Sequence, residues 1–156
     1  MLHKTIEIVI LRHGEADQAT PDRERSLTDY GRRQIKSQYQ WLKEQNFQPD
    51  MILHSPYKRT TETALLAKAF FPNVEMNVES LITPDGNPGM VAELIPALEK
   101  QQLLIASHMP MVSYLTSEFL PELGLFGYPV AGLCWLELSI DNNKASLLHK
   151  HWPSYE

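Results

Sequence analysis

Apolar residues along the chain follow two patterns that alternate. Residues 5–11 are rich in β-branched and apolar side chains, which is typical of a strand. Residues 28 to about 46 instead place Ile35 and Leu42 on one face at helical spacing, and Thr28 is a suitable N-cap. The start of the chain therefore predicts a strand followed by an amphipathic helix.

The alternation continues to the other end of the chain. Further strands are expected at residues 50–54, 74–78, 102–106, 133–140 and 144–149. Further helices are expected at residues 55–71, 88 to about 100, and 110–120. Because strands that alternate with helices favour parallel pairing, we expect an α/β fold. It would be one three-layer domain over residues 1–156, with a mainly parallel sheet and helices on both faces.

Turn and cap residues mark where several of these elements begin or end. Ser55 and Pro56 resemble an N-cap followed by proline at the first helical position, and Ser107 is also interpreted as a helix cap. Pro96 is expected to kink or break the helix in which it lies. Residues 141–143, Asp-Asn-Asn, favour a hairpin between the last two strands. Whether that hairpin joins the sheet is left open by the sequence.

The composition is typical of a globular protein. Of the 156 residues, 43% are hydrophobic and 21% are charged, which is enough apolar material for one core. No stretch approaches the roughly 20 consecutive apolar residues that cross a membrane. The apolar run at residues 8–11 is too short for a signal peptide, and Cys134 is the single cysteine. We therefore expect a cytoplasmic protein without a membrane partner or an internal disulfide.

The formal net charge of −5 argues against nucleic acid as a partner. Nucleic-acid binding depends on Lys and Arg side chains that neutralise phosphates, and an acidic chain of this size repels such a polyanion. Any anionic substrate must then be held by a local cluster of cations, so the positions of individual arginines carry information.

Cationic side chains follow three of the expected strands, at the point where each strand ends. Arg12 and His13 come directly after the first strand, Arg59 follows the second, and His108 follows the strand at residues 102–106. In open parallel sheets, ligands bind beyond the carboxyl ends of the strands. We therefore expect these four side chains to form an anion pocket at one edge of the sheet.

These residue types suit phosphoryl transfer. An arginine fork donates to two phosphate oxygens at once and stays protonated. A histidine is a nucleophile when one ring nitrogen is free and the other is held by a hydrogen bond. Gly14 permits a tight turn after His13, and Arg59 falls in the first turn of a helix, where backbone N–H groups also attract anions.

Four sequence blocks resemble the histidine phosphatase (phosphoglycerate mutase-like) superfamily. LRHGEA at residues 11–16 is similar to its Arg-His-Gly signature, and HSPYKRTTETA at residues 54–64 to its Ser-Pro-x-x-Arg block. IASHMP at residues 105–110 resembles its second histidine block, and RSLTDYGRRQ at residues 25–34 its Leu-Thr-x-x-Gly pattern. The order and spacing of the blocks match across most of the chain. The short length resembles the SixA-type phosphohistidine phosphatases within that superfamily.

This resemblance implies a phosphoglycerate mutase-like fold and a role for each matching residue. His13 would attack phosphorus and form a phosphohistidine intermediate, which water would then hydrolyse. Arg12, Arg59 and His108 would bind the phosphoryl oxygens. No metal or other cofactor is implied. The implied substrate is phosphohistidine on a protein, such as a phosphotransfer domain of a two-component relay.

The general acid of the superfamily has no clear counterpart in this chain. Glu15, Asp17 and Asp85 are the candidates, and the sequence does not choose among them. A phosphorylated imidazole can leave as a neutral ring and needs less acid assistance than an alkoxide. The missing acid therefore favours phosphohistidine over an ordinary phosphate ester.

Several other interpretations stay open at the level of sequence. The chain could be a broad phosphatase acting on small phosphate esters, a phosphoglycerate-type mutase, or a module that binds phosphoproteins without turnover. Arg59 could simply pair with Glu62, its i,i+3 neighbour on the same helix. His149 and His151 have strand spacing but no third ligand in view, so they are interpreted as surface histidines rather than a metal site.

Overall fold

The computed structural model describes residues 4–154. Its strands are β1 (Thr5–Arg12), β2 (Met51–His54), β3 (Glu75–Val78), β4 (Gln102–Ser107), β5 (Leu133–Ser139) and β6 (Lys144–His151). Its α-helices are α1 (Asp29–Glu44), α2 (Lys58–Leu65), α3 (Pro88–Ala97) and α4 (Met111–Phe119). Short 3₁₀ turns include η1 (Asp22–Glu24) and η3 (Ser80–Ile82). Each strand and α-helix corresponds to one expected from the sequence, with shifted ends.

The six strands form one sheet in the order β3-β2-β4-β1-β5-β6. The first four in that order pair in parallel, whereas β5 is antiparallel to β1 and β6 is antiparallel to β5. The expectation of a mainly parallel α/β sheet is therefore confirmed. The carboxyl-terminal hairpin, which the sequence left open, extends the sheet beyond β1.

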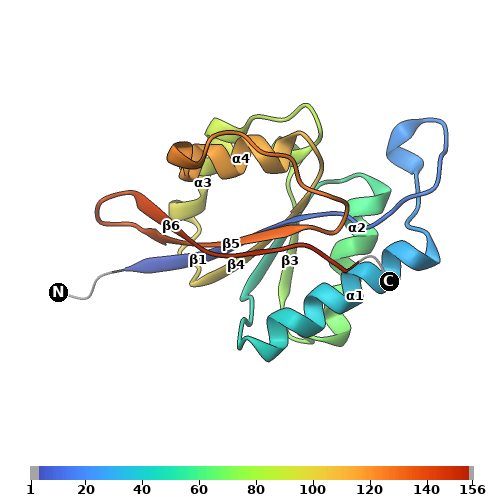
Figure 1. The fold of residues 1–156 in the computed structure, drawn as a ribbon, viewed down its shortest axis with the longest axis horizontal. Coiled ribbons are helices and arrows are strands. Elements are labelled where there is room, and N and C mark those ends of the chain that lie inside the picture. The colour runs from blue at the N-terminus through green and yellow to red at the C-terminus, as the bar shows by residue number, and fades with distance from the viewer. Residues whose placement is uncertain (1–3, 155–156) are drawn as a thin grey trace.

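Helices cover both faces of the sheet, as Figure 1 shows, with α1 and α2 on one face and α3 and α4 on the other. Strand β1 is buried on both faces because helices cover the sheet on both sides of it. Its Ile8 and Ile10 belong to one hydrophobic cluster, and its Val9 and Leu11 to the other. A strand buried on both faces has a continuous apolar sequence rather than an alternating one, which explains the unbroken apolar run at residues 8–11.

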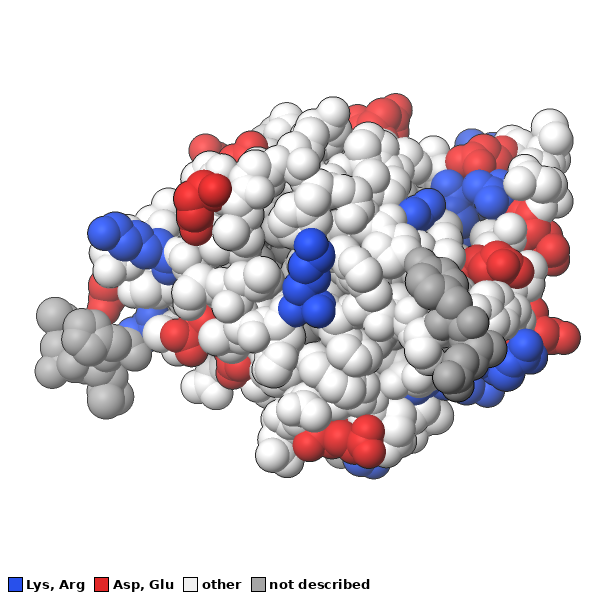
Figure 2. Space-filling view, in the orientation of Figure 1, with Lys and Arg blue, Asp and Glu red and all other residues white. Residues whose placement is uncertain are grey.

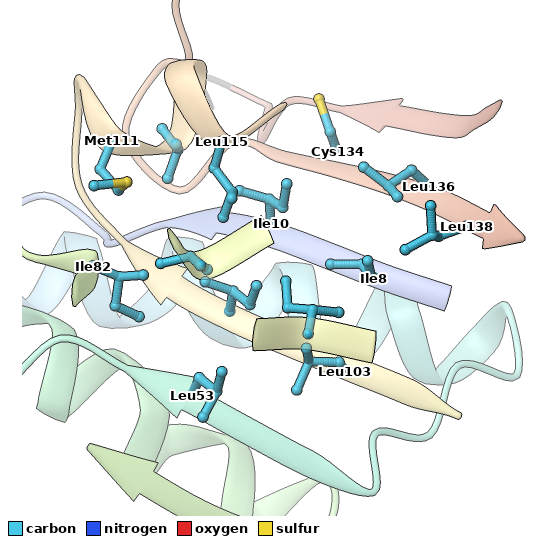
Figure 3. Packing of buried hydrophobic residues seen from close by; sticks show 14 of the residues in the cluster. Ile8, Ile10, Leu53, Ile82, Leu103, Met111, Leu115, Cys134, Leu136 and Leu138 are labelled. Atoms are coloured by element: carbon cyan, nitrogen blue, oxygen red, sulfur yellow. The ribbon is translucent and has the colours of Figure 1, made fainter. Parts of the chain in front are cut away.

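The larger cluster fixes β4 and β1 beneath α4. In Figure 3, Ile8 and Ile10 of β1 and Leu103 of β4 lie on the face of the sheet that Leu115 of α4 covers. All four side chains are fully buried. The central strands therefore form a rigid base, and their carboxyl ends hold the loops that follow them in place.

Two serines do not cap helices, contrary to the expectation from the sequence. Helix α2 begins at Lys58 with Tyr57 at its N-cap, and the backbone at Tyr57 is extended, with a ψ of 149°. Ser55 therefore lies too far before the first turn to cap it. Ser107 is the last residue of β4, and its hydroxyl donates to the carbonyl of Ile82 at 2.6 Å. Both serines are fully buried and serve tertiary contacts instead.

Candidate active site

The carboxyl ends of β1, β4 and β2 lie level with one another. Arg12 pairs with Ser107 across β1 and β4, and His54 pairs with Ala106 across β2 and β4. His13, the residue after β1, continues this alignment, because its N–H donates to the Ser107 carbonyl at 3.1 Å. The residues after these three strands are thus brought to one edge, as the sequence predicted.

His13 lies at the centre of this edge and is 6% exposed. Its Nδ1 lies 2.7 Å from the carbonyl oxygen of Gly14, which can only accept, so Nδ1 carries the proton. Its Nε2 accepts a hydrogen bond from Nε of Arg59 at 3.2 Å. Burial, together with the charges of the neighbouring arginines, lowers the pKa of His13 to about 3 despite the opposing effect of the Gly14 hydrogen bond. Near neutral pH, His13 is uncharged and Nε2 carries a lone pair.

Arg59 is almost completely buried in the first turn of α2 and makes contacts in two directions. Its Nε meets His13, while its Nη1 donates to the backbone carbonyl of Asp22 at 2.9 Å. Its Nη2 donates to the Asp22 carboxylate at 3.1 Å. Glu62 pairs instead with Arg32, at 3.0 Å, so the helix-surface interpretation of Arg59 is wrong.

His108 lies beside His13, with 5.4 Å between the ring centroids. It is 1% exposed, and its Nε2 lies 2.8 Å from the hydroxyl oxygen of Ser55. Its Nδ1 is buried and makes no hydrogen bond within residues 4–154. Burial, then the charges of His13 and Arg59, lowers the pKa of His108 to about 2. His108 is therefore also neutral near neutral pH. Its Nδ1 is the ring nitrogen that could contact a bound ligand.

Arg12 is anchored by the loop that precedes β5. Its Nη1 donates to the carbonyl oxygen of Tyr128 at 2.7 Å. Its backbone N–H donates to the Gly132 carbonyl at 2.9 Å, and the Ala131 N–H donates to the His13 carbonyl at 2.8 Å. Contacts from the far end of the sequence thus hold the Arg12-His13 turn, and none of them was evident from the sequence.

Gly14 allows this turn to lie against the start of α1. A Cβ added to Gly14 would come within 2.5 Å of the Gly31 carbonyl oxygen, and one added to Gly31 within 2.1 Å of the Glu15 carbonyl oxygen. Real Cβ atoms do not approach backbone oxygens so closely, so both positions need glycine. The sequence predicted glycine here for a tight turn after His13, and the packing adds a second reason, the close approach of this turn to α1.

Asp22 is a site residue that the sequence analysis missed. Its carboxylate lies between Arg59, at 3.1 Å, and Arg25, at 3.3 Å. Slight burial raises the pKa of Asp22, but the hydrogen bonds and charges of the two arginines outweigh it and lower the pKa overall. Asp22 is therefore an ionised carboxylate that fixes Arg59, and a poor proton donor near neutral pH. It lies 37 positions from Arg59, in a loop without a recognisable pattern, so no local signal identifies it.

The three carboxylates considered as general acids make other contacts. Glu15 accepts from the Thr28 hydroxyl at 2.9 Å, and Asp85 from the Thr83 hydroxyl at 3.1 Å. No hydrogen bond joins Glu15, Asp17 or Asp85 to His13 in the part of the chain that the structure describes. The choice among them stays a sequence-based hypothesis.

The positive charge of the site is local. In Figure 2, Lys and Arg atoms lie beside Asp and Glu atoms near the loop between β1 and α1, and no broad basic surface covers the face shown. This agrees with the expectation that an acidic chain binds an anion through a small cluster of arginines.

Three further features bear on binding. Among residues 4–154, no three His, Cys, Asp or Glu side chains are placed to hold a metal ion. His149 and His151 pack on Trp41, with the His151 ring stacked at 3.9 Å. Within the same residues, no helix combines the length and apolar character needed to cross a membrane.

The buried histidines predict that stability falls as the pH is lowered from about 6.5. The unfolded chain binds protons at His13 and His108 with ordinary pKa values near 6.5, whereas the folded chain does so only near 3 and 2. Between these values the unfolded state holds more protons, so the free energy of unfolding decreases as pH falls. Urea unfolding at several pH values measures this slope.

The variant His13→Gln provides the control for that slope. It removes one of the two titrating rings, so stability should depend less steeply on pH between 4 and 6.5, by up to about 1.4 kcal/mol per pH unit. An unchanged slope would contradict the assignment of a neutral His13 in the folded state.

Comparison with known proteins adds to this geometry. The family model for the histidine phosphatase superfamily (branch 1) matches residues 8–81, which include Arg12, His13 and Arg59. The phosphohistidine phosphatase SixA homolog of Haemophilus influenzae is 34% identical over 92% of this chain and 93% of its own length. The phosphohistidine phosphatase SixA of Escherichia coli is 33% identical over 74% of this chain and 75% of its own.

Solved structures show the same fold. The protein histidine phosphatase SixA complexed with tungstate superposes with a TM-score of 0.89 at 26% identity, over 95% of this chain and 97% of that one. A phosphoglycerate mutase from Plasmodium falciparum superposes with a TM-score of 0.71 at 22% identity, over 98% and 96% of the two chains. The expectation of a phosphoglycerate mutase-like fold is thus confirmed.

Proposed function

Because this chain belongs to the histidine phosphatase superfamily, we propose that it is a phosphohistidine phosphatase with His13 as its nucleophile. The observation that carries the proposal is the state of His13. Its Nδ1 proton is held by the Gly14 carbonyl, and its Nε2 meets the Nε of a buried arginine. A neutral imidazole oriented in this way can attack phosphorus through its Nε2 lone pair. Arg59 lies next to this nitrogen, where it could donate hydrogen bonds to the phosphoryl oxygens.

In the first step, the Nε2 lone pair of His13 forms a bond to phosphorus and the bond from phosphorus to the substrate nitrogen breaks. The electron pair of that bond leaves with the substrate imidazole, which departs as a neutral ring when its other nitrogen is protonated. The His13 ring becomes a phosphorylated imidazolium, whose Nδ1 keeps its proton and donates it in a hydrogen bond to the Gly14 carbonyl at 2.7 Å. This carbonyl therefore stabilises the positive charge that the ring acquires.

In the second step, water attacks phosphorus and the bond to His13 Nε2 breaks. The electron pair returns to Nε2, and both protons of the water leave with the phosphate as dihydrogen phosphate. His13 is restored as the neutral Nδ1–H form. Neither step requires an external oxidant or reductant, and for a phosphohistidine substrate neither requires a strong general acid.

Arg12, Arg59 and His108 supply donors for the phosphoryl oxygens in both steps. Arg59 already directs its Nε towards His13 Nε2, so a phosphoryl group entering there takes over this donor. Its other edge is held by Asp22, which keeps the guanidinium plane in place without occupying Nε. Donors that are fixed before the reaction stabilise the charge on the transferring group at little reorganisation cost.

A protein carrying phosphohistidine is the proposed substrate, and a phosphotransfer domain in the cytoplasm is the proposed partner. The names of the two relatives from H. influenzae and E. coli support this substrate class. The arrangement of the carboxylates also supports it, since none of Glu15, Asp17 and Asp85 is hydrogen-bonded to His13 among residues 4–154. An alkoxide leaving group without a general acid would lose about 10²- to 10⁴-fold in rate.

The test compares phosphate release from a phosphohistidine-bearing phosphotransfer domain with release from simple phosphate esters. We expect the ratio of kcat/KM to favour phosphohistidine by about 10²-fold or more, in line with the missing acid. His13→Ala should abolish release from both. Faster cleavage of esters would keep His13 as nucleophile but make the chain a small-molecule phosphatase. Tight phosphate binding without release would indicate a binding module instead.

A further inference from the structure

The two nitrogens of the His108 ring have different surroundings. Nε2 lies 2.8 Å from the Ser55 hydroxyl oxygen, whereas Nδ1 is buried with no hydrogen-bond partner among residues 4–154. A neutral imidazole has one proton, on one nitrogen or the other. A phosphoryl oxygen only accepts hydrogen bonds. His108 is therefore useful to a bound phosphate at Nδ1 only when that nitrogen carries the proton.

The surroundings of Ser55 decide the direction of the bond to His108. The Tyr57 N–H approaches the Ser55 hydroxyl oxygen at 3.4 Å and uses one of its lone pairs. Ser55 has a single hydroxyl proton and is completely buried, so water does not compete for it. Among residues 4–154, the other polar atom within hydrogen-bond distance of this hydroxyl is Nε2 of His108, whose lone pair can accept the proton. A bond donated by Ser55 to Nε2 leaves the ring proton on Nδ1.

We propose that Ser55 is a positioning residue that sets the tautomer of His108, so that Nδ1–H donates to the phosphoryl group on His13. In the opposite tautomer, Nε2–H would donate to Ser55 and the Nδ1 lone pair would face a phosphate oxygen, which repels it. The inference rests on the proposed function at His13 and explains why a buried serine lies in the turn after β2.

The neighbouring contacts hold Ser55 in this arrangement. The Thr60 hydroxyl donates to the Ser55 carbonyl at 2.9 Å, and the Ser55 N–H donates to the Ala106 carbonyl at 3.2 Å. The Tyr57 ring packs edge-on against His108 at 4.9 Å between centroids. The serine and the ring it contacts are thus fixed by β4 and by the first turn of α2. Because burial keeps His108 neutral, its tautomer rather than its charge determines what it offers an anion.

The direct test is ¹⁵N NMR of the histidine rings in the free protein. We expect the His108 Nδ1 to give a signal of the proton-bearing type and Nε2 a signal of the unprotonated type. In Ser55→Ala, the two signals should move towards each other or exchange character, because nothing then favours one tautomer. This measurement requires no activity, so it remains informative if the proposed substrate is wrong. A proton on Nε2 in the unsubstituted protein would overturn the proposal.

A second test measures phosphate binding and catalytic activity in serine variants. Ser55→Ala should lower the affinity for inorganic phosphate and kcat/KM for the phosphohistidine protein by about tenfold, as expected for losing one oriented hydrogen bond. Ser55→Thr keeps the hydroxyl and should recover most of both. Ser107→Ala is the matched control, since it removes another fully buried hydroxyl that contacts a carbonyl and not His108. Equal losses in Ser55→Ala and Ser107→Ala would show a merely structural role and contradict the proposal.

Discussion

Replacement of His13 by asparagine should abolish phosphate release, with kcat falling by at least about 10⁴-fold, as when other enzymes lose their nucleophile. Asparagine can still donate an amide proton to the Gly14 carbonyl, the contact that Nδ1 makes at 2.7 Å. It has no counterpart of Nε2, so no bond to phosphorus can form. The measurement is single-turnover release from the phosphohistidine protein, together with the intact mass of the enzyme after mixing.

The mass measurement distinguishes loss of the nucleophile from loss of folding. The unsubstituted protein should gain one phosphoryl group transiently, and His13→Asn should gain none while keeping its circular dichroism spectrum. His54→Asn is a suitable comparison, because His54 is also buried and its Nδ1 lies 3.0 Å from the Ser55 carbonyl, a similar backbone contact. Phosphorylation of His13→Asn, or release at the unsubstituted rate, would refute the central assignment.

Replacement of Arg59 by alanine should lower kcat/KM by about 10³-fold or more, as with other arginines that stabilise a transferring phosphoryl group. The Arg59 guanidinium contacts both His13 Nε2 and Asp22. Its loss removes the donor that faces the nucleophile and takes one of the two arginine partners, Arg59 and Arg25, from the Asp22 carboxylate. The variant should therefore bind phosphate weakly and transfer it slowly.

The variant Arg59→Lys tests whether the positive charge at this position is sufficient or whether the geometry of the guanidinium is also needed. Arg59→Lys keeps one positive charge but cannot donate along two edges at once, so it should recover only a small part of the lost rate. Arg33→Lys is the control, since Arg33 lies on α1 over the Tyr30 ring, away from these contacts. Full activity in Arg59→Lys would mean that charge alone suffices, and that the orientation set by Asp22 has no role.

Local patterns were enough to predict the elements and the sheet edge where the site lies. The β-branched and apolar residues at 5–11 predict a strand, and residues that directly follow parallel strands gather at one edge of the sheet. Arg12, His13, Arg59 and His108 were placed together by this reasoning, and the structure brings them together. Their roles in catalysis remain proposals, which the variants above test.

Partners that are distant in the sequence could not be predicted in the same way. Ser55 was expected to cap α2, because Ser-Pro before a polar stretch usually does so. In the folded chain the segment stays extended through Tyr57 and brings the Ser55 hydroxyl to His108, 53 positions away. A side-chain hydrogen bond to a distant residue leaves no periodic signal in the sequence.

The sequence by itself therefore determined the order of strands and helices, the edge that holds the cations, and the nucleophile candidate. Periodicity and strand ends are local properties of the chain, so they can be recognised in the sequence. Only the tertiary structure decided which polar atoms of His13, Arg59 and His108 already have hydrogen-bond partners. The proton on His13 Nδ1 depends on the path of Gly14, and the fixed plane of Arg59 depends on a loop that returns Asp22 to it. Both are consequences of packing between distant segments, which are set once the whole fold has formed.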